Sequence, residues 1–385
     1  MTIRTLFALL LAAFVACQLS SFAETPKYYT HSLAAQLMTP EKQKAIDLWI
    51  SYLYEPSEDK RKAMWDAAEV ARFGDGYCMF NSLFASFGRE TTLEYFTPYI
   101  LKVEEQKDIF LITTMFTQFD FTPRSDSAYF NQNPISIVKV AVTKNGPGYR
   151  LKNVLDDETK YWKRVDIGKI NYIVEPSIEI DSSECMKAVR FVDSLSLVWH
   201  GKPFDRKIDY YISNSIESIN KLAGFEFSFV GGFGGMANPE ANLLFSDKPI
   251  FNYRHELSHI VFNFPSDSVN RMLSEGMATY FGGMRDQSFA ETKKDFSSKY
   301  YPLKSSDLDK IFDYAGATDF YAFSGLVVEL IIQKKGFAGL RSLASTPRGD
   351  HSKGGGEVFL QHAESMLGIN EQVLLDEINI SLKEK

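Results

Sequence analysis

The chain has 385 residues, of which 45% are hydrophobic, and its net charge is −7 at neutral pH. This length exceeds what one hydrophobic core usually organises, so we expect two folded domains. The charged residues form no basic block that could neutralise a phosphate backbone, which argues against a nucleic-acid partner.

The N-terminus, residues 1–23, predicts a secretory signal peptide. A basic start is followed by an uncharged run that ends at Cys17, and small residues favour cleavage after Ala23. This run is shorter than the roughly 20 residues of a membrane-spanning helix, and we expect no transmembrane helix in the mature chain. As an alternative, residues 14–17 resemble a bacterial lipobox, in which Cys17 would carry a lipid anchor. Both routes predict an exported protein that is periplasmic, bound to the cell envelope or secreted.

The cysteines do not indicate a disulfide framework. Apart from Cys17, the chain contains only Cys78 and Cys185. In an oxidising compartment these two residues can form one disulfide, whereas the alternative is a pair of buried free thiols. The spacing leaves both alternatives open.

Residues 24–163 predict a separate α+β domain. Between Pro40 and Arg72 the sequence is rich in helix-forming residues at helical spacing, which indicates one or two amphipathic helices. Three later segments are rich in β-branched and aromatic residues, with turn residues between them, and predict antiparallel strands at Ile109–Phe116, Ile135–Thr143 and Tyr149–Leu155. No cluster of histidine, cysteine or acidic residues in this domain resembles a functional site.

Residues 164–385 predict a second domain in which strands precede helices. Alternating and helical patterns predict strands at 169–174, 207–212 and 241–246 and helices at 182–199 and 215–222. From Phe251 onward, almost every segment has the spacing of a helix. The complete chain is therefore expected to be of the α+β class.

The segment Arg254–Phe262 contains the pattern His-Glu-x-x-His. In a helix, His255 and His259 lie four residues apart, so both imidazoles project from one face and can share a metal ion. Glu256 follows His255 directly and lies beside such an ion without joining the same ligand face. It is therefore placed to accept a proton from a water molecule. Pro265 predicts the end of this helix.

A third ligand is required, because catalytic zinc generally has three protein ligands and an open fourth position. Arg271–Gly283 predicts a second helix, and its closing Gly282 and Gly283 suit a helix end. Glu275 lies in this helix at a separation from His259 that allows the two helices to form an antiparallel pair. The sequence therefore predicts a metal site between two helices.

The sequences of residues 255–259 and 274–280 together resemble the metal-binding segments of the gluzincin zinc metallopeptidases. The resemblance extends over residues 165–345 and implies a zincin-like domain, with a small mixed sheet, then helices, and one Zn²⁺ per chain between two helices. It implies that Glu275 is the third zinc ligand. It also assigns Thr279 to the position of a group that supports a ligand histidine.

The expected function is that of an exported zinc metallopeptidase that hydrolyses peptide or protein substrates. Glu256 is the expected general base toward a zinc-activated water. Tyr321 is the candidate donor to the oxyanion that develops on the substrate carbonyl, and the alternative is that it is a core aromatic residue. The alternative function is a non-catalytic envelope or peptide-binding protein that retains the fold.

Overall fold

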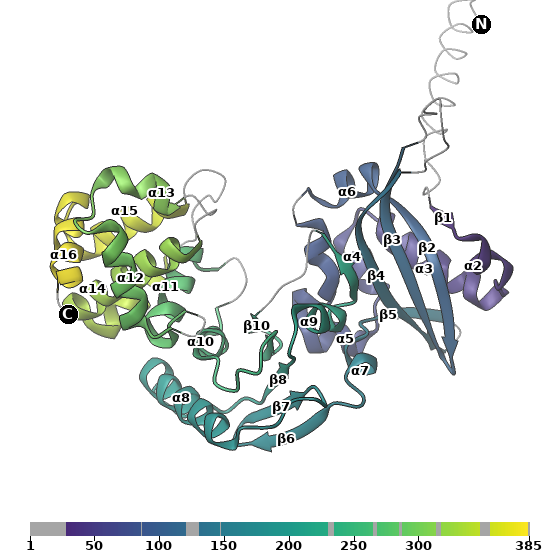
Figure 1. Ribbon diagram of the computed structural model, residues 1–385, viewed down its shortest axis with the longest axis horizontal. Helices are drawn as coiled ribbons and strands as arrows, with labels where there is room; N and C mark the ends of the chain where they lie inside the picture. Colours follow the sequence, from purple (N-terminus) through teal and green to yellow (C-terminus); the bar gives the residue numbers. More distant parts are fainter. Residues whose placement is uncertain are drawn as a thin grey trace, which may run out of the picture. The chain divides into compact units, whose positions relative to one another are not determined.

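A computed structural model describes residues 28–85, 87–120, 131–146, 148–229, 235–264, 268–284, 287–312, 317–346 and 355–383 (Figure 1). The predicted signal peptide and Cys17 lie outside the described residues. The chain is of the α+β class, with two mixed sheets and many helices. Within the described part of the chain, no helix has the length and apolar character that crossing a membrane would require.

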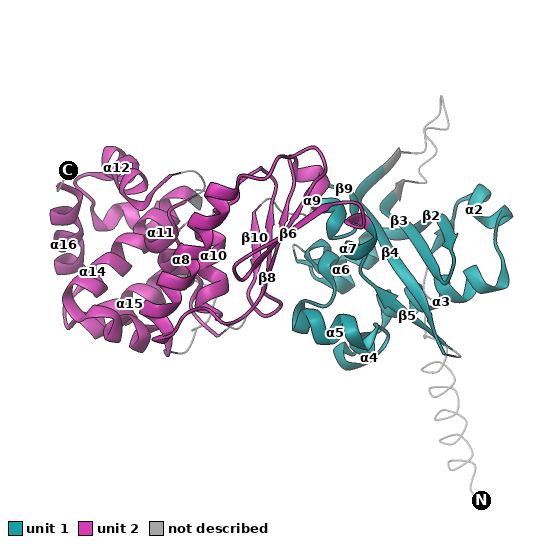
Figure 2. Cartoon of the chain, turned by 90° about the horizontal axis from the view of Figure 1, so that it is seen from below, with its two compact units in different colours: residues 1–157, 220–232 teal, residues 158–219, 233–385 magenta. Residues whose placement is uncertain are grey.

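The chain divides into two compact units (Figure 2). Unit 1 contains residues 1–157 and 220–232, and unit 2 contains residues 158–219 and 233–385. The segment 220–232, which the sequence analysis assigned to the second domain, therefore groups with the first unit. Each unit is described separately below.

The helices of unit 1 precede most of its strands. They are α2 (Ser32–Gln36), α3 (Pro40–Tyr54), α4 (Glu58–Ala63), α5 (Ala67–Phe73) and α6 (Arg89–Tyr95). The sequence predicted one or two helices between residues 40 and 72, whereas the structure has three. The first break falls at Glu55 and Pro56, because proline disfavours a helical conformation in the residue before it. Asp66 opens α5 by accepting a hydrogen bond from the Ala68 amide at 2.9 Å.

The sheet of unit 1 is built mainly of long antiparallel strands. Its order is β1-β2-β3-β4-β5, and β9 also pairs with β4. The predicted strands correspond to the last three of these five, whereas β1, β2 and β9 were not predicted. The bounds are β1 (Tyr29–Thr30), β2 (Thr97–Gln106), β3 (Ile109–Asp120), β4 (Asn131–Asn145), β5 (Gly148–Lys152) and β9 (Phe225–Ser228). Helix α3 packs against this sheet, and Trp49 donates a hydrogen bond to Thr114 at 2.9 Å.

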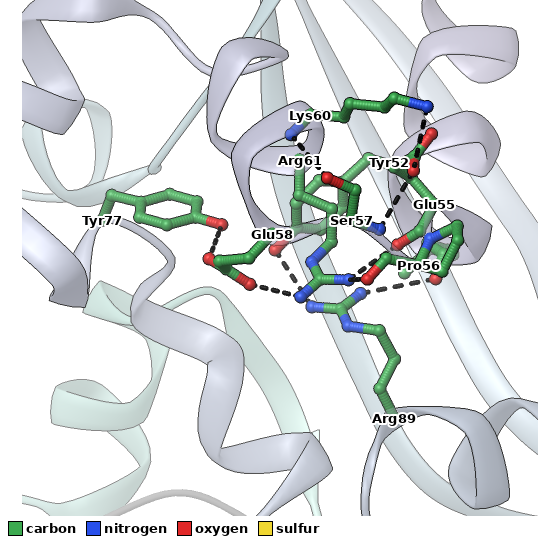
Figure 3. Close-up of polar contacts among 10 residues, drawn as sticks. Tyr52, Glu55, Pro56, Ser57, Glu58, Lys60, Arg61, Tyr77 and Arg89 are labelled. Carbon is green, nitrogen blue, oxygen red and sulfur yellow. Dashed lines mark hydrogen bonds and ion pairs between the residues drawn. The ribbon is translucent and has the colours of Figure 1, made fainter.

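A group of polar side chains surrounds the C-terminal end of α3, and we call Glu58, Arg61, Tyr77 and Arg89 the α3-end cluster (Figure 3). Arg61 donates to the carbonyl oxygens of residues 55 and 56 at 2.7 and 2.9 Å and forms an ion pair with Glu58. The Tyr77 hydroxyl donates to Glu58 at 2.6 Å. Arg89 donates to the carbonyl oxygen of residue 53 at 3.4 Å. Because the last carbonyls of a helix lack partners within it, both arginines stabilise this helix end.

The sheet of unit 2 has the order β10-β11-β8-β7-β6. The three inner strands are parallel, and each edge strand is antiparallel to its neighbour. The bounds are β6 (Lys163–Ile167), β7 (Ile170–Val174), β8 (Ile208–Ile212), β10 (Met236–Asn238) and β11 (Leu243–Ser246). Alternate residues of β7 and β8 share one hydrophobic core with α8 (Ser182–His200).

The helices of unit 2 complete the same core. They are α10 (Arg254–Phe262), α11 (Arg271–Gly282), α12 (Phe289–Tyr300), α13 (Leu308–Phe312), α14 (Ala317–Ala344), α15 (Gly355–Leu367) and α16 (Glu371–Lys383). Helix α11 packs against both α10 and α14. Two short helices, α7 (Leu155–Glu158) and α9 (Ile216–Leu222), span the divisions between the units.

The two cysteines of the described residues form no disulfide. Cys78 in unit 1 and Cys185 in unit 2 are both buried free thiols, as in the second alternative that the sequence left open.

Candidate metal centre

Helix α10 is short and almost completely buried. Leu257, Ile260 and Val261 are fully inaccessible to solvent and contribute to the core. The helix ends at Asn263, whose φ of 51° and ψ of 46° are left-handed, a conformation that asparagine tolerates better than most residues. Pro265, the predicted stop, lies outside the described residues.

The last carbonyl groups of α10 receive hydrogen bonds from residues outside the helix. A ring nitrogen of His200 lies 2.7 Å from the carbonyl oxygen of Val261. Arg206 donates to the carbonyl oxygen of Ile260 at 2.7 Å. These contacts satisfy buried acceptors that would otherwise destabilise the helix end. They also give His200 a structural role.

Helix α11 approaches both neighbouring helices through glycines. A Cβ atom at Gly276 would lie 2.6 Å from the backbone oxygen of Ser324 in α14. A Cβ atom at Gly282 would lie 2.5 Å from the backbone nitrogen of His255 in α10. Since real Cβ atoms do not approach backbone atoms this closely, only glycine permits the two contacts. The register of α11 beside α10 is therefore fixed at its C-terminal end.

His255, His259 and Glu275 come together between α10 and α11. One potential ligand atom from each residue lies within 4.8 Å of the others, so the group can hold a metal ion. An oxygen of Glu275 lies 3.2 Å from Nε2 of His255 and 3.4 Å from Nε2 of His259. The two imidazole rings are 5.0 Å apart between centroids. The helical spacing and the antiparallel helix pair therefore bring the three predicted ligand residues together.

The hydrogen bonds of the two imidazoles orient Nε2 of both rings toward Glu275. Nδ1 of His255 donates to the carbonyl oxygen of Gly283 at 2.8 Å, and Nδ1 of His259 lies 3.4 Å from the Ser274 hydroxyl. The Gly283 carbonyl can only accept, so a neutral His255 ring has its lone pair on Nε2. The Ser274 hydroxyl can donate or accept, so it permits the same tautomer of His259. With both rings in that form, the centre consists of two nitrogen lone pairs and a carboxylate. Three hydrogen-bond acceptors at these distances need a proton or a cation between them. As metal ligands, two imidazole nitrogens and one carboxylate oxygen suit a divalent metal.

The electrostatics of the metal-free centre follow from the same contacts. Burial alone would lower the pKa of His255, but the hydrogen bond to Glu275 and the nearby Glu256 and Glu275 charges raise that pKa overall. Burial would raise the pKa of Glu275, yet hydrogen bonds from His255 and His259 hold it well below its ordinary value. The carboxylate is therefore ionised and available to a cation.

The remaining predicted residues lie in different surroundings. The Glu256 side chain is buried beside His255 and is 9% exposed. The Tyr321 ring, on α14, packs edge-on against His255, with 5.8 Å between ring centroids. Thr279 is fully buried, and its hydroxyl has no hydrogen-bond partner among the described residues. The position that the resemblance assigns to a supporting group is therefore not used in that way here.

Sequence reasoning missed two groups that lie within hydrogen-bond distance of the ligand histidines, the Ser274 hydroxyl and the Gly283 carbonyl. Ser274 precedes Glu275, and its hydroxyl can be recognised as a contact only when the distance between the helices is known. Gly283 was predicted only as part of a helix end, although its carbonyl contacts His255. The type of a residue does not show where its backbone carbonyl points.

Comparison with known proteins assigns no family: neither a protein-family model nor a curated protein matches this chain.

Proposed function

We propose that this chain is an exported zinc-dependent peptidase and that unit 2 is a zincin-like catalytic domain. The observation that carries the proposal is the convergence of His255, His259 and Glu275, with Glu256 adjacent on the same helix. Two imidazoles and one carboxylate match the ligand set of catalytic zinc sites that keep an open position. The group contains no cysteine, which distinguishes it from most structural zinc sites.

A zinc ion held by these three residues would supply the Lewis acidity that makes a water molecule nucleophilic near neutral pH. Glu256 accepts the proton of the attacking water and later delivers it to the leaving amine. Its burial favours this role, because a carboxylate with little solvent around it transfers protons to a bound partner rather than to bulk water. The phenol of Tyr321, whose ring packs on His255, donates to the developing oxyanion.

Strand β10 gives the proposed substrate a place to bind. It lies at the end of its sheet, pairs with β11, and packs against α10. The free edge of a strand can accept an extended peptide through main-chain hydrogen bonds. The substrate proposed on this basis is an extended peptide or an unfolded segment of a protein, and its scissile bond would lie beside α10.

The test compares Glu256→Gln with Glu275→Gln in the full chain. Removing the general base should lower peptide turnover by roughly 10²–10⁴-fold while zinc remains bound. Glu275→Gln should lower zinc affinity itself, because a neutral amide is a poor zinc ligand. Zinc content is measured by elemental analysis and turnover on a mixed peptide library, with and without a chelator.

The matched control is Glu357→Gln, the same change at an exposed position of α15. It should retain both zinc and turnover. Wild-type turnover by Glu256→Gln with zinc bound would remove Glu256 from the mechanism. In that case the non-catalytic peptide-binding protein would be the better description.

A further inference from the structure

The contact between Gly283 and His255 determines which ring nitrogen carries a proton. The carbonyl oxygen of Gly283 lies 2.8 Å from Nδ1 of His255. A carbonyl group has no hydrogen to donate, so Nδ1 must be the donor. In the neutral ring, the lone pair is then on Nε2, the atom that lies beside Glu275. A backbone group thus selects the tautomer that can bind a cation together with the carboxylate.

Only glycine can present the carbonyl in this way. Gly283 has φ of 77° and ψ of −161°, a combination that residues with side chains essentially do not adopt. A Cβ atom at this position would also lie 2.1 Å from the backbone oxygen of Gln287. Reciprocal hydrogen bonds between Met284 and Gln287, at 2.9 and 3.0 Å, hold that oxygen in place. A side chain at position 283 would therefore displace the Gly283 carbonyl from its position beside His255.

Two further observations identify the Gly283 carbonyl, and not a side chain of α11, as the group that supports His255. Gly282 allows the end of α11 to approach the backbone of His255, which brings the carbonyl within range. The Thr279 hydroxyl, one helical turn from Glu275, makes no hydrogen bond to any described residue. Ligand histidines generally need a partner on the second nitrogen to fix ring orientation. Here the backbone, not a side chain of α11, provides it for His255.

We propose that Gly283 is a positioning residue, whose carbonyl fixes the tautomer and ring orientation of His255 for a divalent cation. The proposal rests on the metal centre of the proposed function but not on peptide hydrolysis. It states that the affinity for the cation depends on the backbone conformation at a residue that carries no ligand atom of its own.

The first experiment measures zinc affinity of the purified full chain by competition with a chromophoric chelator. Gly283→Ala should weaken binding roughly 10–100-fold, the usual effect of losing a partner of a ligand histidine. The matched control is Gly368→Ala, which also has a positive φ, of 71°, but whose new methyl group would meet no atom within 4 Å. Equal zinc affinities for the two variants would overturn the proposal.

The second experiment uses the wild-type chain, so it does not depend on how Gly283→Ala folds. Nitrogen NMR of histidine-labelled, zinc-loaded protein reports which ring nitrogen binds the metal, with His255 assigned through the His255→Gln variant. We expect a protonated Nδ1 and a metal-bound Nε2, and the reverse arrangement would overturn the proposal. Zinc binding without peptide turnover would contradict the peptidase function but not the role of Gly283. A wild-type chain that binds no divalent cation would contradict both.

Discussion

The metal centre of unit 2 and the α3-end cluster of unit 1 are both groups of ionisable side chains, but they differ in how their polar atoms are matched. In the α3-end cluster, two arginines donate to backbone carbonyls, and one of them also pairs with Glu58. In the metal centre, the contacts of Nδ1 leave two imidazole nitrogens facing one carboxylate. The first group contains its own cations, and the second does not.

This difference separates a structural network from a candidate functional site. Buried polar groups stabilise a fold only when they find partners, and unmatched acceptors are costly. Arg61 and Arg89 supply donors and positive charge to the α3-end cluster, in which the buried Nε of Arg61 has no hydrogen-bond partner among the described residues. The acceptors of that cluster therefore have cationic partners within the chain. The metal centre lacks a resident positive group other than a protonated histidine, so a bound cation would complete it. The balance of donors and acceptors is thus more informative than the number of charged residues.

The largest expected effect is the response of stability to zinc. A site that binds only in the folded state should raise the free energy of unfolding by about 4 kcal/mol when free zinc is 1,000-fold above its dissociation constant. We expect this gain for the wild-type chain and its loss in His259→Gln, because the centre then lacks a ligand. Urea unfolding at fixed free zinc measures both. An undiminished gain in His259→Gln would place the bound zinc elsewhere.

A smaller effect is expected in the α3-end cluster. Arg61→Met removes charged hydrogen bonds to two backbone carbonyls and the ion pair with Glu58, and the Arg61 side chain is only 13% exposed. We expect a loss of about 2 kcal/mol in the free energy of unfolding, with unchanged zinc affinity. Arg61→Lys keeps the charge without the planar fork and should lose less. A change in zinc affinity in either variant would contradict the separation of the two networks.

The smallest effect is expected at Thr279. Thr279→Val replaces a fully buried hydroxyl that has no hydrogen-bond partner among the described residues with a methyl group of similar size. Because no hydrogen bond is lost, zinc affinity should stay at the wild-type value, and stability should be unchanged or higher by up to about 1 kcal/mol. Chelator competition and urea unfolding measure the two quantities. A tenfold loss of zinc affinity would restore Thr279 as a support of the centre.

The features that the sequence predicted are those that depend on local spacing. His255 and His259 meet because residues four apart share a helix face, and Glu275 joins them because the two helices pack as a pair. Strands β7 and β8 and helix α8 also follow from patterns of neighbouring residues. For the histidine pair, the strands and α8, a short window of residue types contains the physical cause of the structure, whereas Glu275 was assigned through the resemblance of its segment to a known family.

The features that were missed depend on contacts distant in sequence or on backbone conformation. Strand β9 pairs with β4 across a long separation, and nothing in residues 225–228 indicates that partner. Strand β2 ends in Glu104, Glu105 and Gln106, a polar run that hides the strand pattern. The carbonyl of Gly283 could not be assigned to His255 because its direction follows from φ and ψ, which one glycine in a sequence does not reveal.

The pairing of β9 with β4 also sets when the sheet of unit 1 can be completed during synthesis. Unit 1 begins with the first part of the chain, yet its sheet includes residues 225–228, which are synthesised only after β6, β7, α8 and β8 of unit 2. While the chain is growing, the neighbouring edge of β4 therefore lacks this partner until the segment emerges. The sheet of unit 1 is therefore complete only after residue 228 has been synthesised, and a shortened chain that stops at residue 163 would leave this part of the β4 edge without its partner.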